Sequence, residues 1–234
     1  KNVQKTANNA LSLRTRAKIA IMTNRWRLAQ AAEKRWWKQY LSGKESGAYL
    51  RKKKAYWHRV LQEFAVELPV GIQVLDAGCG PAGIFIALDR QRVTAIDPLL
   101  ADYAALDHFD PSWYPWVQFQ ACPLEMYAAG EAYSWAFCLN AINHVADLDK
   151  ALHHLTQAVG EGGELLLTVD VHRSPWLKAI FRAVPGDILH PHQHGRDDYL
   201  QRLCKMGWSI RQIKNLKTGK IFNYIGIHAV KTNA

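Results

Sequence analysis

The segment Val74-Leu75-Asp76-Ala77-Gly78-Cys79-Gly80-Pro81-Ala82-Gly83 carries the strongest fold signal in the sequence. It begins with apolar residues that are typical of a buried strand, and it continues with the spacing G-x-G-x-x-G. Glycines let a backbone turn sharply and approach a ligand without an intervening Cβ atom. The stretch therefore predicts a strand that ends in a ligand-binding turn, followed by a helix over Ile84–Asp89.

Short apolar segments alternate with helical ones from Gly71 onward. Such alternation requires crossover helices and produces a parallel α/β sheet, whose ligands bind at the carboxyl ends of the strands. The last residues predict a closing hairpin, Trp208–Lys214 with Ile221–Lys231, turning at Gly219. Before it, strands are expected over the segments Ile72–Asp76, Arg92–Asp97, Trp116–Ala121, Tyr133–Leu139 and Glu164–Val171.

The chain before this sheet has a different composition. The spacing of its aromatic residues predicts two helices, over Asn24–Leu41 and Ala48–Leu68. Residues 1–60 hold 16 Lys or Arg but only two acids, and the whole chain carries a formal net charge of +10. We therefore expect a basic helical N-terminal extension over residues 1–68 and a ligand-binding domain over residues 69–234.

The basic extension admits two interpretations. Both helices can pack their aromatic residues on the main domain and leave their charges in water. Alternatively, the extension contacts RNA or an anionic membrane surface, while Trp26, Trp36, Tyr40 and Tyr56 anchor it to the domain. Residues 1–21 are a native segment, a targeting remnant or an added extension, and the sequence does not distinguish these origins.

The size and the cysteines narrow the class of protein. The 234 residues allow one catalytic-sized core with an appendage. No run approaches the ~18 unbroken apolar residues of a membrane span. Cys79, Cys122, Cys138 and Cys204 lie far apart, which suggests neither a zinc cage nor a disulfide scaffold. A cytoplasmic location is therefore expected.

Two residues, Pro81 and Asp76, discriminate between the ligands that such a glycine turn can bind, whereas Asp97 does not. Asp97, at the end of the second expected strand, would accept hydrogen bonds from the ribose of either a dinucleotide or S-adenosylmethionine. A pyrophosphate requires amide donors, and Pro81 removes one of them. Asp76 would repel a pyrophosphate but attract a sulfonium and an ammonium group. The turn therefore favours S-adenosylmethionine.

From about Val70 to Ile213 the chain resembles the class I S-adenosylmethionine-dependent methyltransferases. The glycine stretch is similar to the first motif of that family, and Val93-Thr94-Ala95-Ile96-Asp97-Pro98 is similar to its acidic second-strand motif. Phe137–Val145 resembles the segment that flanks cofactor and acceptor. The resemblance implies an α/β, Rossmann-like, doubly wound sheet of seven strands, mostly parallel, with an antiparallel last strand.

The resemblance also implies a set of contacts to the cofactor S-adenosyl-L-methionine. Cys122 stands where the family usually has an acid beside the adenine. The backbone around Pro123, or the side chain of Glu125, is the alternative source of that contact. The implied cofactor-binding residues are Asp76, Gly78, Gly80, Asp97, Pro98, Cys122, Leu124 and Asn140.

Methyl transfer needs alignment of the reactants and exclusion of water, and a catalytic base is optional. His144 follows the fourth expected strand and is the candidate base and acceptor contact, with a histidine that only bonds its own loop as the alternative. Trp176, His192 and His194 are further candidate acceptor contacts, because His190–His194 resembles the loop that often covers the acceptor pocket. No metal is expected, since three imidazoles in five residues would be cramped.

These observations predict an S-adenosylmethionine-dependent methyltransferase with a small-molecule or lipid-like acceptor. An RNA methyltransferase and a catalytically silent methyltransferase-like scaffold with a basic docking module are the alternatives.

Overall fold

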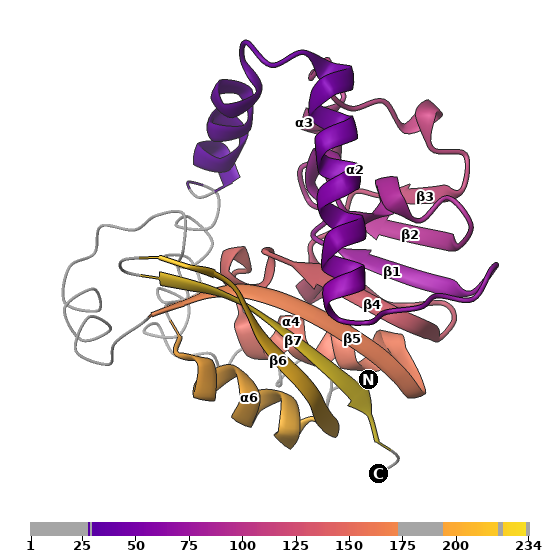
Figure 1. The fold of residues 1–234 in the computed structure, drawn as a ribbon, viewed down its shortest axis with the longest axis vertical. Helices are drawn as coiled ribbons and strands as arrows, with labels where there is room; N and C mark the ends of the chain where they lie inside the picture. The colour runs from indigo at the N-terminus through magenta and orange to yellow at the C-terminus, as the bar shows by residue number, and fades with distance from the viewer. Residues whose placement is uncertain (1–27, 29, 173–193, 220–221, 233–234) are drawn as a thin grey trace, which may run out of the picture.

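A computed structural model of the chain describes residues 28, 30–172, 194–219 and 222–232. Seven strands form one sheet in the order β3-β2-β1-β4-β5-β7-β6, with helices on both faces (Figure 1). The strands are β1 Gln73–Ala77, β2 Arg92–Ile96, β3 Val117–Gln120, β4 Tyr133–Leu139, β5 Val159–His172, β6 Trp208–Thr218 and β7 Phe222–Lys231. The helices are one over residues 30–41, then α2 Ser46–Glu63, α3 Leu100–Tyr103, α4 Leu148–Ala158 and α6 Arg196–Lys205.

The direction of the strands confirms the expected fold. β1 pairs in parallel with β2 and β4, and further parallel pairs join β2 to β3 and β4 to β5. β7 runs antiparallel to both of its neighbours, β5 and β6. The seven-stranded, mostly parallel Rossmann-like sheet therefore closes with a hairpin, as the sequence predicts.

The helix expected directly after the glycine turn is replaced by two short 3-10 turns, Gly80–Ala82 and Ile84–Ala87. Gly83 between them has extended backbone, with φ −70° and ψ −173°. A Cβ atom there would lie 2.4 Å from the Cys79 carbonyl oxygen and 2.5 Å from Asp76 Oδ2. The prediction of a regular helix over Ile84–Asp89 is therefore wrong, because the chain must turn tightly around these two atoms.

Alternating residues of the strands supply two hydrophobic layers. Leu75 of β1 and Cys138 of β4 belong to the layer that α4 and α6 cover. Val74 and Phe137, one residue earlier on the same strands, belong to the layer that α2 covers. Each face of the sheet is thus buried by helices, which is the reason that the strands are apolar on both sides.

α2 lies against the second layer and is tied to the sheet at two points. The Trp57 indole donates a hydrogen bond to the Ala82 carbonyl oxygen at 3.0 Å. Further along the helix, Phe64 covers Gly226 of β7, where an added Cβ atom would lie 2.4 Å from Phe64 Cζ. α2 falls within the extension expected over residues 1–68, and its apolar side chains are part of the same cluster as the sheet.

The helix over residues 30–41 rests on α3. Trp37 meets the ring of Tyr103 edge to face, with centroids 6.2 Å apart, and Lys34 forms an ion pair with Asp102. Trp36 and Tyr40, which we expected to anchor the extension, are 45% and 40% exposed. The prediction for these two residues is wrong, because the side of the helix that packs against the domain lies one residue further along the chain, at Trp37.

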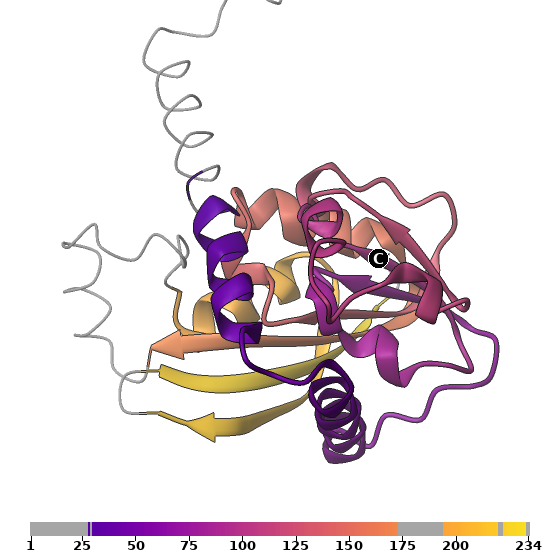
Figure 2. The same cartoon turned by 90° about the horizontal axis from the view of Figure 1, so that it is seen from above.

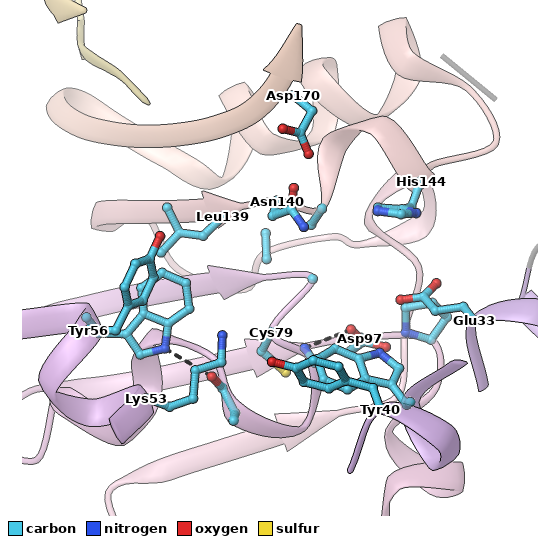
Figure 3. A pocket seen from close by; sticks show the side chains of 18 of the residues that line it. Glu33, Tyr40, Lys53, Tyr56, Cys79, Asp97, Leu139, Asn140, His144 and Asp170 are labelled. Carbon is cyan, nitrogen blue, oxygen red and sulfur yellow. Dashed lines mark hydrogen bonds between the residues drawn. The ribbon is translucent and has the colours of Figure 1, made fainter. Parts of the chain in front are cut away.

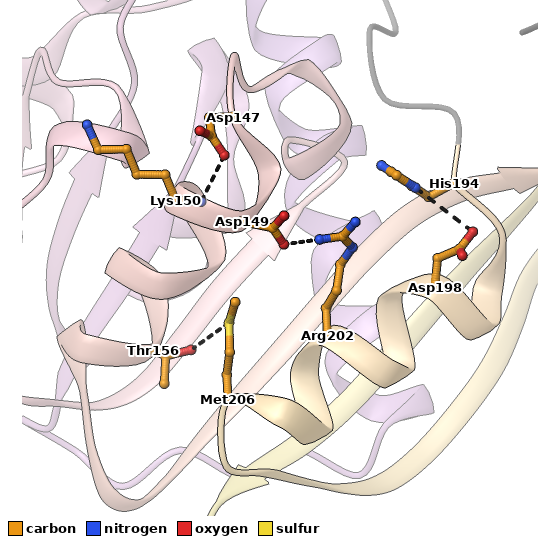
Figure 4. A network of polar contacts seen from close by, with 8 residues as sticks. All are labelled: Asp147, Asp149, Lys150, Thr156, His194, Asp198, Arg202 and Met206. Atoms are coloured by element: carbon orange, nitrogen blue, oxygen red, sulfur yellow. Dashed lines mark hydrogen bonds and ion pairs between the residues drawn. The ribbon is translucent and has the colours of Figure 1, made fainter. Parts of the chain in front are cut away.

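α6 packs beside α4, and polar contacts join them (Figure 4). Arg202 of α6 forms an ion pair with Asp149 of α4. Asp147 caps α4 by accepting a hydrogen bond from the Lys150 amide at 3.0 Å.

Within the described residues, no helix combines the length and hydropathy needed to cross a bilayer.

Candidate functional site

A cavity of about 800 Å³ opens at the carboxyl ends of β1, β2, β3 and β4. In Figure 2 the helix over residues 30–41 and α2 both lie beside this end of the sheet. Figure 3 shows the cavity from close by. Its lining contains most of the predicted site residues: Gly78, Gly80, Asp97, Pro98, Cys122, Leu124, Asn140 and His144.

The glycine turn forms the floor of the cavity with a backbone that only glycine tolerates well. Gly78 has φ +74°, and a Cβ atom there would lie 2.3 Å from the Cβ of Ala141. Gly80 has φ +57°, and its absent Cβ would lie 3.5 Å from the Trp37 ring. The turn is therefore held between the β4 loop and the N-terminal helix.

Asp97, directly after β2, faces the cavity with a fixed carboxylate. Its Oδ2 accepts a hydrogen bond from the Gly80 amide at 2.9 Å, and its Oδ1 accepts one from the Leu99 amide at 2.8 Å. The side chain is 6% exposed, and burial raises the pKa of Asp97 above its usual range. Each carboxylate oxygen keeps a second lone pair, so the group can still accept hydrogen bonds from a pair of ribose hydroxyls.

Asp76 lies behind the cavity wall rather than in it. Its Oδ2 accepts a hydrogen bond from the Phe85 amide at 3.1 Å, and the side chain is 1% exposed. Burial, helped by the nearby Asp97 charge, raises the pKa of Asp76 to about 7. Asp76 therefore holds the start of the second 3-10 turn and is not among the residues that line the cavity.

The loop after β3 supplies Cys122, Leu124 and Glu125 to the lining. Glu125 Oε1 accepts hydrogen bonds from the amides of Ala146 at 2.5 Å and Asp147 at 3.3 Å. Its carboxylate therefore joins the loop after β3 to the loop after β4. The Cys122 thiol donates weakly to the Pro123 carbonyl oxygen at 3.3 Å.

The loop after β4 places two side chains at the cavity. Asn140 has φ +57°. Its backbone N–H donates hydrogen bonds to the Thr168 carbonyl oxygen at 2.9 Å and to the Thr168 hydroxyl oxygen at 3.0 Å. His144 ends a 3-10 turn, Ile142–His144, and its ring enters the cavity beside Asn140 in Figure 3. Both predicted residues therefore reach the cavity from the expected strand end.

The N-terminal helix adds a second carboxylate that the sequence analysis missed. Glu33 lines the cavity near Asp97, as Figure 3 shows. Burial and the Asp97 charge raise the pKa of Glu33 to about 7. Glu33 is one of only two acids in the first 60 residues, and an acid in so basic a segment could have marked it as a candidate site residue.

The far end of the cavity is lined by residues from several separate elements. Tyr56 comes from α2, Asp170 from β5 and Tyr224 from β7. The Tyr224 hydroxyl lies 2.5 Å from the Thr168 hydroxyl, and burial raises the pKa of both tyrosines. The phenols are therefore protonated at neutral pH and can donate hydrogen bonds. Lys53, also from α2, is a further lining residue that the sequence did not predict.

The remaining predicted acceptor contacts do not line this cavity within the described residues. His194 stacks edge to face on Tyr199, with centroids 5.8 Å apart, and its Nδ1 lies 3.9 Å from Asp198 Oδ2 (Figure 4). His194 therefore lies just before the start of α6. Trp176 and His192 lie outside the described residues.

Comparison with known proteins places this site in a family context. A family profile described as methyltransferase domain matches residues 49–213, which is most of the chain and begins inside α2. A search of curated proteins finds no match to the sequence.

Several solved structures share the fold. The YcgJ protein from Bacillus subtilis is 14% identical, with a TM-score of 0.62 over 75% of this chain and 98% of that chain. The 1,6-didemethyltoxoflavin-N1-methyltransferase of Burkholderia thailandensis, with S-adenosylhomocysteine bound, is 17% identical, with a TM-score of 0.59 over 95% and 92%. Magnesium protoporphyrin IX methyltransferase from Synechocystis, also with S-adenosylhomocysteine, is 17% identical, with a TM-score of 0.59 over 87% and 94%.

Proposed function

The chain belongs to the class I S-adenosylmethionine-dependent methyltransferases, and from that premise we propose that its acceptor is a small or lipid-like molecule. One observation carries this proposal: the cavity continues past the glycine turn to a partly aromatic end lined by Tyr56, Leu139 and Tyr224. Its volume of about 800 Å³ lies in the range of ~300–1,000 Å³ that small-molecule pockets occupy. The two S-adenosylhomocysteine-bound relatives described above are named for small molecules, 1,6-didemethyltoxoflavin and magnesium protoporphyrin IX, which agrees with this size.

The residues present at the near end fit S-adenosylmethionine. Asp97 offers free lone pairs to the ribose hydroxyls, and Gly78 and Gly80 line the cavity beside it. The loop that holds Cys122 and Leu124 is the proposed adenine contact. When bound, the cofactor supplies an electrophilic methyl group on a sulfonium.

The chain itself then has to align the acceptor and keep water out. Tyr56 and Tyr224 can donate hydrogen bonds to the acceptor, while α2 covers the cavity. We assign His144 the role of general base, which takes a proton from an acceptor hydroxyl or amine through a neutral ring nitrogen. The position of His144 in the lining of the cavity, in the loop after β4, supports this role.

The decisive experiment identifies the acceptor. Protein and S-adenosylmethionine carrying a labelled methyl group are incubated with a cell extract that has been fractionated into small molecules, lipids, RNA and protein. The proposal expects label in the small-molecule or lipid fraction. Label in RNA would show the alternative acceptor, and no label despite measurable cofactor binding would show a silent scaffold.

A further inference from the structure

The charge of the cofactor leaves one requirement that the residues discussed above do not meet. S-adenosylmethionine ends in an amino acid, whose carboxylate needs a cationic or amide partner once it leaves water. Asp97 and Glu33 are acids, and Asn140 is neutral. A cation at the methionyl end of the proposed cofactor site, on which this inference rests, would supply that partner.

The order of the strands fixes where that end lies. The proposed adenine contacts, Cys122 and Leu124, follow β3, and the proposed ribose contact, Asp97, follows β2. β1 is the next strand along the sheet, and β4 follows it. A cofactor laid across β3 and β2 in this direction brings its methionyl end onto the glycine turn that follows β1.

Lys53 is the cation that stands over this turn. It lies one helical turn before Trp57, whose indole nitrogen is bonded to the Ala82 carbonyl oxygen of the same turn. The Lys53 ammonium lies 4.9 Å from the centre of the Trp57 ring and 5.5 Å from that of Tyr56. Figure 3 shows its side chain pointing from α2 into the cavity.

The Lys53 ammonium carries its charge without an acid beside it. No carboxylate in the described ranges forms an ion pair with Lys53, whereas its neighbour Lys54 pairs with Asp89 at 3.0 Å. Lys53 is half-buried, and burial lowers its pKa. The lining also contains Lys44, Lys52, Arg59 and Lys217, and all four of these cations are exposed. An anion that enters the cavity therefore gains most by meeting Lys53.

We propose that Lys53 binds the carboxylate of the methionyl group of the cofactor. The cation-π contacts with Trp57 and Tyr56 hold the ammonium above the glycine turn before the cofactor arrives. α2 thereby closes the cavity and also contributes to cofactor binding, which links its position on the sheet to the affinity for S-adenosylmethionine.

A pair of ligands tests this assignment: S-adenosylmethionine, and decarboxylated S-adenosylmethionine, which lacks only the carboxylate. Their dissociation constants are measured by calorimetry for the wild-type chain, Lys53→Met and the control Lys54→Met. We expect the wild-type chain to bind the decarboxylated ligand about 10- to 100-fold more weakly, as for loss of a charged hydrogen bond. Lys53→Met should lose this discrimination, and Lys54→Met should keep it.

Three outcomes would overturn the assignment. Equal binding of both ligands by the wild-type chain would do so without any variant, which covers the case of a misfolded Lys53→Met protein. Retained discrimination in Lys53→Met would give the carboxylate another partner. Failure of the wild-type chain to bind either ligand would instead remove the proposed cofactor site itself, and the Lys53 assignment with it.

Discussion

At the near end of the cavity, the glycine turn and Asp97 belong to one continuous segment of the sequence, whereas the far end is built from residues that only the tertiary fold brings together. Gly78, Gly80 and Asp97 come from one β-turn-β segment, and backbone amides fix their positions. Tyr56, Asp170 and Tyr224 come from α2, β5 and β7. The glycine turn is therefore encoded locally, whereas the far end of the cavity is formed by packing.

The largest effect should come from breaking the near end at Gly78. Gly78→Ala would force a Cβ atom to within 2.3 Å of the Ala141 Cβ at φ +74°. Left-handed strain and overpacking together should lower the free energy of unfolding by about 2–5 kcal/mol and abolish binding of S-adenosylhomocysteine. Chemical denaturation and calorimetry measure both. Gly71→Ala is the control, because Gly71 has φ +78° but no atom near its Cβ position; equal losses in both variants would contradict the account.

A smaller effect, confined to the chemistry, is expected at His144, in the loop after β4. His144→Gln should slow methyl transfer to the acceptor about 100-fold or more, because it removes the base, and leave the affinity for S-adenosylhomocysteine unchanged. Label transfer to the fraction that the wild-type chain methylates provides the rate. His153→Gln, an exposed change on α4, should have no effect. A normal rate in His144→Gln would leave His144 with a role in its loop alone.

The packing of the far end can be tested at Gly226. Gly226→Ala would place a Cβ atom 2.4 Å from Phe64 Cζ and push α2 from the sheet. We expect a loss of about 1–3 kcal/mol in the free energy of unfolding. Gly130→Ala, where no atom lies within 4 Å of the new Cβ, serves as the control in the same denaturation experiment. Unchanged stability of Gly226→Ala would mean that α2 is not seated against β7 as described.

The smallest effect concerns Glu33, the carboxylate that the helix over residues 30–41 adds to the cavity. Its pKa of about 7 lies above the value of about 4.3 expected in the unfolded chain. The folded state therefore binds the proton more tightly, and stability falls as pH rises from about 4 to about 7. Glu33→Gln removes this loss, so it should gain on the order of 1 kcal/mol relative to wild type between pH 5 and pH 8.

Thermal or denaturant unfolding at the two pH values measures that gain. Glu45→Gln is the control with the opposite sign, because hydrogen bonds from the Ala48 and Gly47 amides lower the pKa of Glu45. Its wild-type contribution is present above the unfolded pKa and lost as the pH falls. A Glu33→Gln protein that tracks the wild type at both pH values would place Glu33 in water rather than beside Asp97.

The sequence predicts the sheet well because apolar strands and glycine turns are local signals. The glycine spacing and Asp97 are equally local signals, and both lie at the cavity, whereas Asp76 turns away to bond the Phe85 amide. The short 3-10 turns after β1 could not be predicted, since they follow from the contact of Gly83 with atoms on both sides.

The cavity residues that α2, β5 and β7 contribute were not predicted, for a different reason. Lys53 belongs to a run of basic residues that reads as a solvated face, yet it is spaced four residues from both Tyr49 and Trp57 on the buried face of α2. Helical spacing alone would have placed it there. Asp170 and Tyr224 carry no such signal, because only the pairing of β5 with β7 brings them opposite each other.

The most direct test of the account is a calorimetric titration of S-adenosylhomocysteine into the wild-type chain and Asp97→Asn, with a nicotinamide dinucleotide as the competing ligand class. We predict that S-adenosylhomocysteine binds the wild-type chain at one site and that the dinucleotide does not bind. Asp97→Asn should lose about 1.5–3 kcal/mol of binding free energy, the scale of hydrogen bonds to a charged group. Equal affinity in both proteins, or tighter binding of the dinucleotide, would contradict it.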